Sequence, residues 1–251
     1  MLIETRDGAT MILTLNAPER RNALALKMRE AMIAALQRIA EDRSVRAVVV
    51  TGAGGHFCAG GDISGMDVKD LGAGLERFRV SHRLVRALIE MDRPVVAAVD
   101  GWAAGAGVGL ALCCDTIVAA EDSHFVTPFG RIGLVGDFAL LHTLPRRIGE
   151  GLARQMLLSG DAIDAATAER WGLVDHLVPP GKVLEKALER AARLAQSAPL
   201  ATALTKAKFA EGLADLLEWE RTVQSALFAT ADHQEGKAAF LGKRAPAFKG
   251  N

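Results

Sequence analysis

The segment that decides the fold, residues 95–115, reads VVAAVDGWAAGAGVGLALCCD. It begins as an apolar strand, passes through a turn of small residues, and ends with helical character. Such a turn brings free backbone N–H groups and the positive end of a helix dipole together. The valine strand near residue 48 leads into a similar glycine-dense loop, GAGGHFCAGGD (52–62). Two such segments could aim two N–H donors at one oxygen, as in an oxyanion hole, although close strand–helix packing also explains the small residues.

Outside these two segments, short apolar runs alternate with helical patterns. Continuous apolar runs predict strands that are buried on both faces and covered by helices, and they lie at residues 11–15, 45–50, 95–99 and 116–120. Apolar residues at helical spacing predict amphipathic helices over residues 23–39 and 183–194. Asp164 is expected to cap a short helix that ends before Gly172. The chain after residue 197 shows only helical patterns.

Composition restricts the class of protein. The 251 residues carry 30 basic and 30 acidic side chains, and this balance argues against nucleic acid or an anionic membrane as the main partner. The three cysteines, Cys58, Cys113 and Cys114, show neither disulfide nor metal-ligand spacing. The N-terminus has no signal-peptide pattern, and the longest apolar run, 103–114, is too short for a membrane span, which needs about 20 residues. We therefore expect a cytoplasmic globular protein without a metal.

Five motifs in order along nearly the whole chain resemble the crotonase family, also called the enoyl-CoA hydratase/isomerase family. They are NAPERRNAL (16–24), FCAGGDI (57–63), the segment 101–115, IDAATAERWGLV (163–174) and GKAAFLGKRAPAFKG (236–250). The segment FVTPFGRIGLVGD (125–137) and the Gly-Ala-Gly of residues 105–107 are most similar to those of the enoyl-CoA isomerases of phenylacetate degradation.

The resemblance implies an α/β fold, the crotonase (ClpP-like) spiral of ββα units, with a C-terminal helical trimerisation region. Residues 1–196 would form the core and residues 197–251 the oligomerisation region of a homotrimer or a dimer of trimers. The substrate would be an acyl-CoA thioester, so that coenzyme A arrives with the substrate and no cofactor is permanently bound. The N–H groups of Gly61 and Ala106 would hold the thioester oxygen. The residues implied in CoA binding are Glu19, Arg20, Arg21, Ala59, Gly61, Asp62 and Ile63, although solvation is an equally good explanation for the two arginines.

The acid/base residues decide the reaction. The two glutamates with which family hydratases activate water correspond to Gly109 and Phe129, so two-glutamate hydration is not expected. Asp137 lies eight residues after Phe129, where several family isomerases carry an aspartate. One carboxylate suffices to shift a double bond, and apolar neighbours should raise its pKa. The alternative is that Asp137 caps a helix beginning near Phe138.

Two other functions stay open. His82 matches a histidine of the family's 4-chlorobenzoyl-CoA dehalogenases, in which Asp137 would be the nucleophile and His82 the base. Those enzymes carry a tryptophan where this chain has Phe129, which weakens that interpretation. The second alternative is a catalytically inactive acyl-CoA-binding subunit. The acyl group would be lined by residues 63–80 together with Trp102, Phe129 and Phe138.

Overall fold

Two sheets form the framework of the chain, whose computed structural model describes residues 1–66, 68 and 70–251. In the larger sheet β1 and β2 are antiparallel and every other neighbouring pair is parallel. Its strands, in spatial order, are β1 (Leu2–Asp7), β2 (Thr10–Leu15), β3 (Ala47–Gly52), β4 (Val95–Val99), β6 (Thr116–Ala120) and β9 (His176–Val178). The smaller sheet contains β5 (Trp102–Ala104), β7 (His124–Val126) and β8 (Ile163–Asp164).

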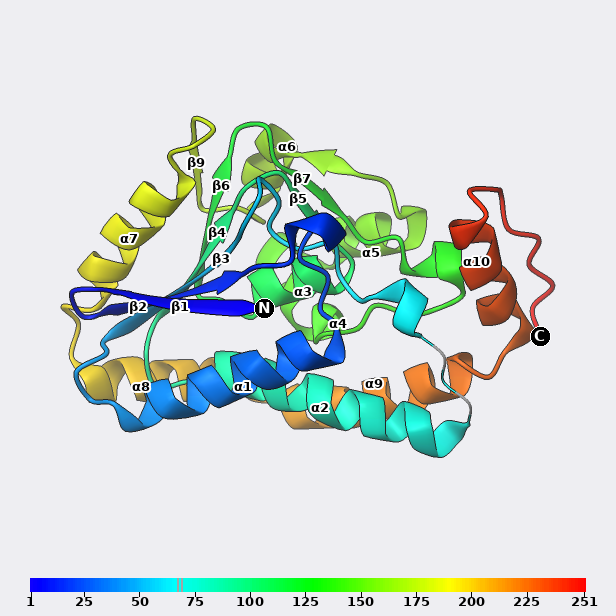
Figure 1. The fold of residues 1–251 in the computed structure, drawn as a ribbon, viewed down its shortest axis with the longest axis horizontal. Coiled ribbons are helices and arrows are strands. Elements are labelled where there is room, and N and C mark those ends of the chain that lie inside the picture. The colour runs from blue at the N-terminus through cyan, green and yellow to red at the C-terminus, as the bar shows by residue number, and fades with distance from the viewer. Residues whose placement is uncertain (67, 69) are drawn as a thin grey trace.

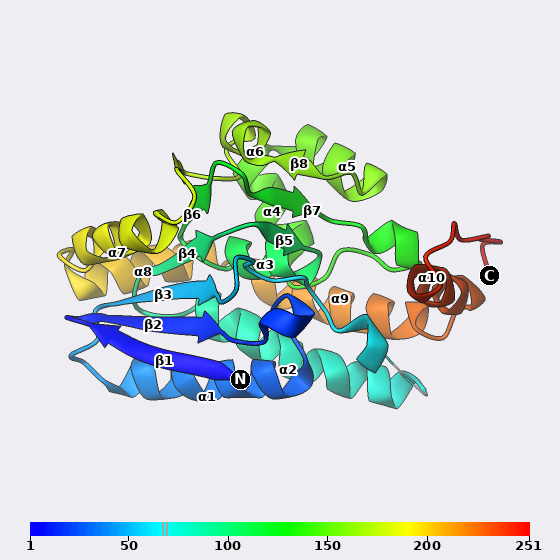
Figure 2. The ribbon, with the colours of Figure 1, turned by 45° about the horizontal axis from the view of Figure 1, so that its top comes forward.

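Helices cover both faces of the larger sheet, as the continuous apolar runs predicted. α7 (Val183–Leu194) packs on the face that carries Val49 and Val96. α1 (Leu26–Glu41) and α2 (Leu71–Ile89) contribute to the core on the face that carries Val48, and both run below the sheet in Figure 2. Successive strand residues point to opposite faces, so every residue of β4 is buried.

Short helices and turns connect these layers (Figure 1). Asp164 caps α6 by accepting a hydrogen bond from the Thr167 N–H at 2.8 Å, and Gly172 ends the helix in the left-handed conformation, which confirms both predictions. The connecting elements are η1 (Pro18–Arg20), η2 (Ile63–Gly65), α3 (Ala106–Leu112), η3 (Phe129–Ile132), α4 (Leu140–Ile148), α5 (Glu150–Ser159) and α6 (Ala165–Trp171).

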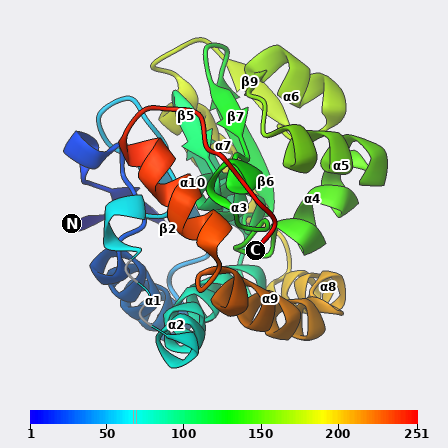
Figure 3. The ribbon, with the colours of Figure 1, turned by 90° about the vertical axis from the view of Figure 1, so that its right-hand side faces the viewer.

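The C-terminal part consists of α8 (Pro199–Phe209), α9 (Leu213–Leu227) and α10 (Ala231–Leu241). α9 packs along α2, and α10 packs against η3 (Figure 3). The helices after residue 197 were predicted, whereas β1, β9 and the smaller sheet were not, because their strands are short or exposed. Within the described residues, no helix has both the length and the apolar character that a bilayer crossing requires.

Candidate active site

The two glycine-rich loops meet at the carboxyl ends of β3 and β4. The Cys58 N–H donates to the Trp102 carbonyl at 3.1 Å, and the Ala104 N–H donates to the Cys58 carbonyl at 2.9 Å. Gly60 adopts a φ of 88°, and a Cβ there would lie 2.5 Å from the Ala104 oxygen and 3.3 Å from the Ala106 nitrogen. Only glycine therefore lets the first loop lie this close to the second.

The backbone donors that were predicted for the oxyanion hole are available. Ala106 is the first residue of α3, and all of that helix is buried. Among the described residues, neither the Gly61 N–H nor the Ala106 N–H has an acceptor within the protein. Two unpaired donors on adjoining loops are what a developing oxyanion requires.

The residues predicted to contact CoA lie next to this loop. The Ala59 N–H donates to the Arg21 carbonyl at 2.9 Å, and the Leu24 N–H donates to the Gly60 carbonyl at 2.7 Å. Arg20 lies 3.2 Å from Asp62 in an ion pair. Glu19 lies beside Arg20 in η1, and Ile63 begins η2. The structure thus brings the predicted set together, and its role in binding CoA stays a prediction.

Asn22 is a structural residue of this region that the sequence analysis did not single out. It is fully buried, and its side-chain amide donates to the carbonyls of Ala53 and His56 at 2.8 and 2.7 Å. Its side-chain oxygen accepts from the Ala17 N–H at 2.9 Å. These three bonds fix the segment around residues 17–22 to the loop that carries Gly61.

Asp137 places a carboxyl group with an unusual environment near the two loops. The residue as a whole is partly exposed, but its Oδ1 atom is shielded from solvent and has no hydrogen-bond partner among the described residues. Desolvation, followed by the charge of Glu220, raises the pKa of Asp137 to about 7, against the lowering influence of Arg29 and Arg77. A pKa near neutrality suits a group that both accepts and returns a proton.

Asp137 does not cap the helix that follows it. α4 begins at Leu140, and its N-cap residue is Ala139, with no side-chain cap bond. The backbone bends through Phe138 and Ala139, whose φ angles of 61° and 59° lie in the left-handed region. Such angles cost of order 1–3 kcal/mol each in a non-glycine residue and persist only where the surroundings impose them.

Glu220 supplies that constraint, and the sequence analysis missed it. Its carboxylate is fully buried and accepts hydrogen bonds from the Phe138 and Ala139 N–H groups, each at 3.0 Å. It also lies 2.8 Å from His82 Nε2. His82 therefore points at Glu220, and through Glu220 it contacts the turn that carries Asp137.

Two further hydrogen bonds from α9 hold the segment just before Asp137. The Gln224 side chain donates to the Val135 carbonyl at 2.8 Å and accepts from the Val135 N–H at 3.3 Å. Glu220 and Gln224 follow the buried Leu213 and Leu217 on the same face of α9. Two polar residues on a buried helical stripe are the sequence signal that could have revealed them.

The two positions of the hydratase glutamates are apolar in space as well as in sequence. A Cβ on Gly109 would lie 2.6 Å from the Phe138 Cβ and 3.0 Å from the Phe138 carbonyl oxygen. The buried Phe129 ring lies 3.6 Å from the Cβ position of Gly105, next to the start of α3. Phe138 therefore fills the space that a side chain at position 109 would need.

Arg29 is a buried cation beside the first loop, and it too was missed. Its side chain is 4% exposed, its Nε donates to the Leu24 carbonyl at 2.8 Å, and one Nη donates to the Ser81 hydroxyl. Its second Nη lies 3.8 Å from the Cβ position of Gly61. Desolvation and the like charge of Arg77 lower the pKa of Arg29 to about 10.

Cys58, Trp102 and the segment 63–80 are the remaining features singled out in the sequence around this site. Burial raises the pKa of the Cys58 thiol to about 12, so that this thiol stays neutral. Trp102 stacks on His124, with ring centroids 4.7 Å apart. Of the segment 63–80 that was predicted to line the acyl group, residues 67 and 69 lie outside the described residues. Among the residues described, no group of three His, Cys, Asp or Glu side chains could hold a metal ion.

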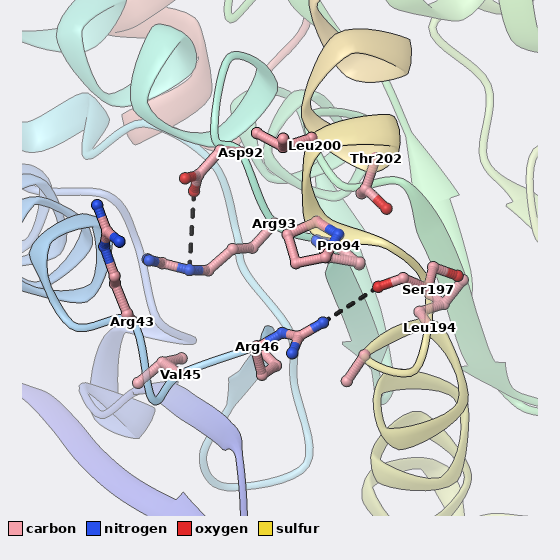
Figure 4. A pocket seen from close by; sticks show the side chains of 12 residues that line it. Arg43, Val45, Arg46, Asp92, Arg93, Pro94, Leu194, Ser197, Leu200 and Thr202 are labelled. Carbon is pink, nitrogen blue, oxygen red and sulfur yellow. Dashed lines mark hydrogen bonds and ion pairs between the residues drawn. The ribbon is translucent and has the colours of Figure 1, made fainter.

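A surface pocket of about 350 Å³ lies away from these groups, where β3 and β4 begin (Figure 4). Arg46 donates across it to the Ser197 carbonyl at 3.1 Å, and Arg93 lies 3.7 Å from Asp92. None of the predicted site residues lines this pocket. The candidate chemistry therefore stays at the carboxyl ends of the strands.

Comparisons with known proteins identify the family of the chain. The family model described as enoyl-CoA hydratase/isomerase matches residues 5–251. The chain is 38% identical to the 2,3-dehydroadipyl-CoA hydratase of Escherichia coli K12, over 99% of this chain and 98% of that protein. It is 36% identical to the 1,2-epoxyphenylacetyl-CoA isomerase of the same organism, over 97% and 96% of the two chains.

Solved structures give the same result. The crystal structure of an enoyl-CoA hydratase from Mycobacterium avium subsp. paratuberculosis K-10 superposes with a TM-score of 0.88 at 33% identity, covering 99% of this chain and 98% of that one. The enoyl-CoA hydratase/isomerase from Pseudoalteromonas atlantica T6c gives a TM-score of 0.89 at 29% identity, covering 99% of both chains. The predicted crotonase fold is thereby confirmed, and the chain belongs to the enoyl-CoA hydratase/isomerase family.

Proposed function

We propose that the protein is an enoyl-CoA isomerase that moves a double bond with Asp137 as the single acid/base. The observation that carries this proposal is the Asp137 carboxyl, whose shielded Oδ1 has no hydrogen-bond partner among the described residues and whose pKa is about 7. The Asp137 carboxylate takes a proton from C2 of a 3-enoyl thioester. The electron pair moves onto the thioester oxygen, where the N–H groups of Gly61 and Ala106 stabilise the dienolate. Asp137 then returns the proton at C4, and the 2-enoyl thioester is formed.

The surroundings of Asp137 favour this chemistry over addition of water by two glutamates. Phe138 blocks the Cβ position of Gly109, and the Phe129 side chain has no acid/base group that could activate water. Glu220 is a second carboxylate close to Asp137, but it is fully buried and occupied by His82 Nε2 and two backbone N–H groups. A water molecule held between two carboxylates therefore has no evident place here.

The same contacts weigh against the aryl-CoA alternative. A hydrolytic base must reach the water that attacks the aryl ester on Asp137. His82 Nε2 is instead hydrogen-bonded to Glu220 at 2.8 Å. An inactive binding subunit is the remaining alternative, and a measurement of proton exchange separates it from an isomerase.

The test is incubation of a short 3-enoyl-CoA, and separately of its 2-enoyl isomer, with the enzyme in D₂O, followed by mass spectrometry. We expect interconversion of the isomers together with deuterium uptake at C2 and C4. A product heavier by one water would identify a hydratase. Unchanged thioesters would favour an aryl-CoA substrate or an inactive binding subunit.

We also propose that the chain assembles as a homotrimer or a dimer of trimers, with residues 1–196 as the catalytic core and 197–251 as the oligomerisation region. α8 supports this proposal because its apolar side chains Leu200, Leu204 and Phe209 are 80%, 73% and 75% exposed. Sedimentation equilibrium is expected to give three or six times the 26.6 kDa chain mass. The Leu200→Glu/Leu204→Glu variant should fall to smaller species, whereas Leu158→Glu, at an exposed position on α5, should not.

A further inference from the structure

Two arginine side chains approach Asp137 from neighbouring helices. Arg29 lies on α1 and Arg77 on α2, and the charges of both act on Asp137 and on each other. Among the described residues, neither guanidinium forms an ion pair with a carboxylate. Arg77 makes a hydrogen bond from Nη1 to the Gly65 carbonyl at 3.3 Å.

This arrangement leaves two guanidinium groups beside the reacting group without an ion-pair partner among the described residues. Arg29 is almost fully buried, and a buried charge is normally paired. The negative charge of Asp137 acts on both arginines and that of Asp62 acts on Arg77, but among the described residues no ion pair joins either arginine to a carboxylate. Glu220 is already occupied by His82 and the turn of Phe138 and Ala139.

The position of the arginines relates them to the acyl group of the substrate. The second Nη of Arg29 lies 3.8 Å from the Cβ position of Gly61, whose N–H is proposed to hold the thioester oxygen. Arg77 contacts Gly65, a few residues further along the same loop. An anionic group within a few carbons of the thioester would meet both side chains, and a guanidinium binds a carboxylate well because its donors match the two oxygens.

We propose that Arg29 and Arg77 select acyl-CoA substrates whose acyl chain ends in a carboxylate, that is, CoA thioesters of short dicarboxylic acids. The inference deepens the proposed function, since it rests on Gly61 and Asp137 as the site of the reaction. It makes the two arginines specificity-determining residues, with no part in proton transfer.

The test uses saturated thioesters, which bind without reacting. Dissociation constants are measured by calorimetry for succinyl-, glutaryl- and adipyl-CoA, each against the uncharged thioester of equal chain length. For at least one pair we expect the carboxylate to bind about 10- to 100-fold more tightly, as hydrogen bonds between charged groups allow. Because no chemistry is involved, this result is independent of whether the enzyme is an isomerase.

Three variants assign the effect. Arg77→Gln should reduce the preference to less than about threefold without changing the affinity for the uncharged thioester. Arg29→Lys keeps the buried charge and should retain part of the preference. Arg83→Gln, an exposed position on the same helix, should leave the preference unchanged. Equal affinities for all pairs in the wild-type protein, or a preference that survives Arg77→Gln and Arg29→Lys unaltered, would overturn the proposal.

Discussion

Replacing Asp137 by asparagine is expected to lower kcat for double-bond migration by at least about 10²–10⁴-fold, the contribution of one acid/base group. Asparagine has nearly the same shape, but it cannot accept the C2 proton. The Gly61 and Ala106 N–H groups are untouched, so KM for the thioester should change little. Deuterium incorporation from D₂O, measured with the wild-type protein in parallel, gives the rate directly.

The same substitution should make the protein more stable at alkaline pH. The folded-state pKa of Asp137 is about 7, above the 3.8 of an unperturbed aspartate. The unfolded chain therefore ionises first, and wild-type stability is lost as pH rises from about 4 to about 7. Asparagine does not titrate. The free energy of unfolding of the Asp137→Asn variant, relative to that of the wild type, should therefore increase by about 1–4 kcal/mol across this pH window and stay constant above it.

Denaturant unfolding at pH 4, 6 and 8 checks this prediction. Asp161→Asn is the control, because Asp161 is exposed and its carboxylate pairs with the exposed Arg131 at 2.9 Å. A structural role for Asp137 predicts the reverse pattern, with retained proton exchange and reduced stability at pH 8. The two readouts together separate a catalytic carboxyl from a purely structural one.

The parts of this site that the sequence predicted are local. Gly61 and Ala106 are proposed to act through their backbone N–H groups, and the loops that carry them follow recognisable strands, so the pattern allowed their convergence to be predicted. Asp137 was identified by its place in a motif. Its pKa was expected to rise because of apolar neighbours, and desolvation is indeed the main cause.

The rest of the site depends on contacts that are distant in sequence. Glu220 reaches Phe138 from α9, and Arg29 reaches Ser81 from α1. The sequence around Glu220 does not predict that it will bind a strained turn, and the sequence around Arg29 does not predict that it will bind a hydroxyl on another helix. The alternative, in which Asp137 caps a helix beginning near Phe138, fails for this reason: Glu220 holds two left-handed residues there, and the helix starts at Leu140.

Glu220→Gln is expected to shift the acid limb of the kcat/KM profile to lower pH. The charge of Glu220 is the second cause of the raised pKa of Asp137, so its removal lets Asp137 stay ionised in more acidic solution. The wild-type limb should lie near pH 7, because kcat/KM reports the pKa of the free enzyme's base.

The substitution should also loosen the turn. The amide retains an acceptor oxygen, yet it no longer offers a carboxylate to both the Phe138 and Ala139 N–H groups and to His82. We expect kcat to fall about 10- to 100-fold because Asp137 is less well positioned. Glu220→Ala, which leaves three buried donors without an acceptor, should cost about 3–5 kcal/mol of stability.

The His82→Phe variant separates the effect of the Glu220 charge from the effect of the hydrogen bond between His82 and Glu220. It removes one donor to Glu220 but leaves the carboxylate charge next to Asp137, so the acid limb should stay in place or move to higher pH. If Glu220→Gln leaves the acid limb of the kcat/KM profile at the same pH as in the wild type, the raised pKa of Asp137 comes from desolvation alone. If His82→Phe instead abolishes proton exchange while the turn stays folded, His82 takes part in the chemistry, and the aryl-CoA mechanism gains the base that its hydrogen bond to Glu220 argues against.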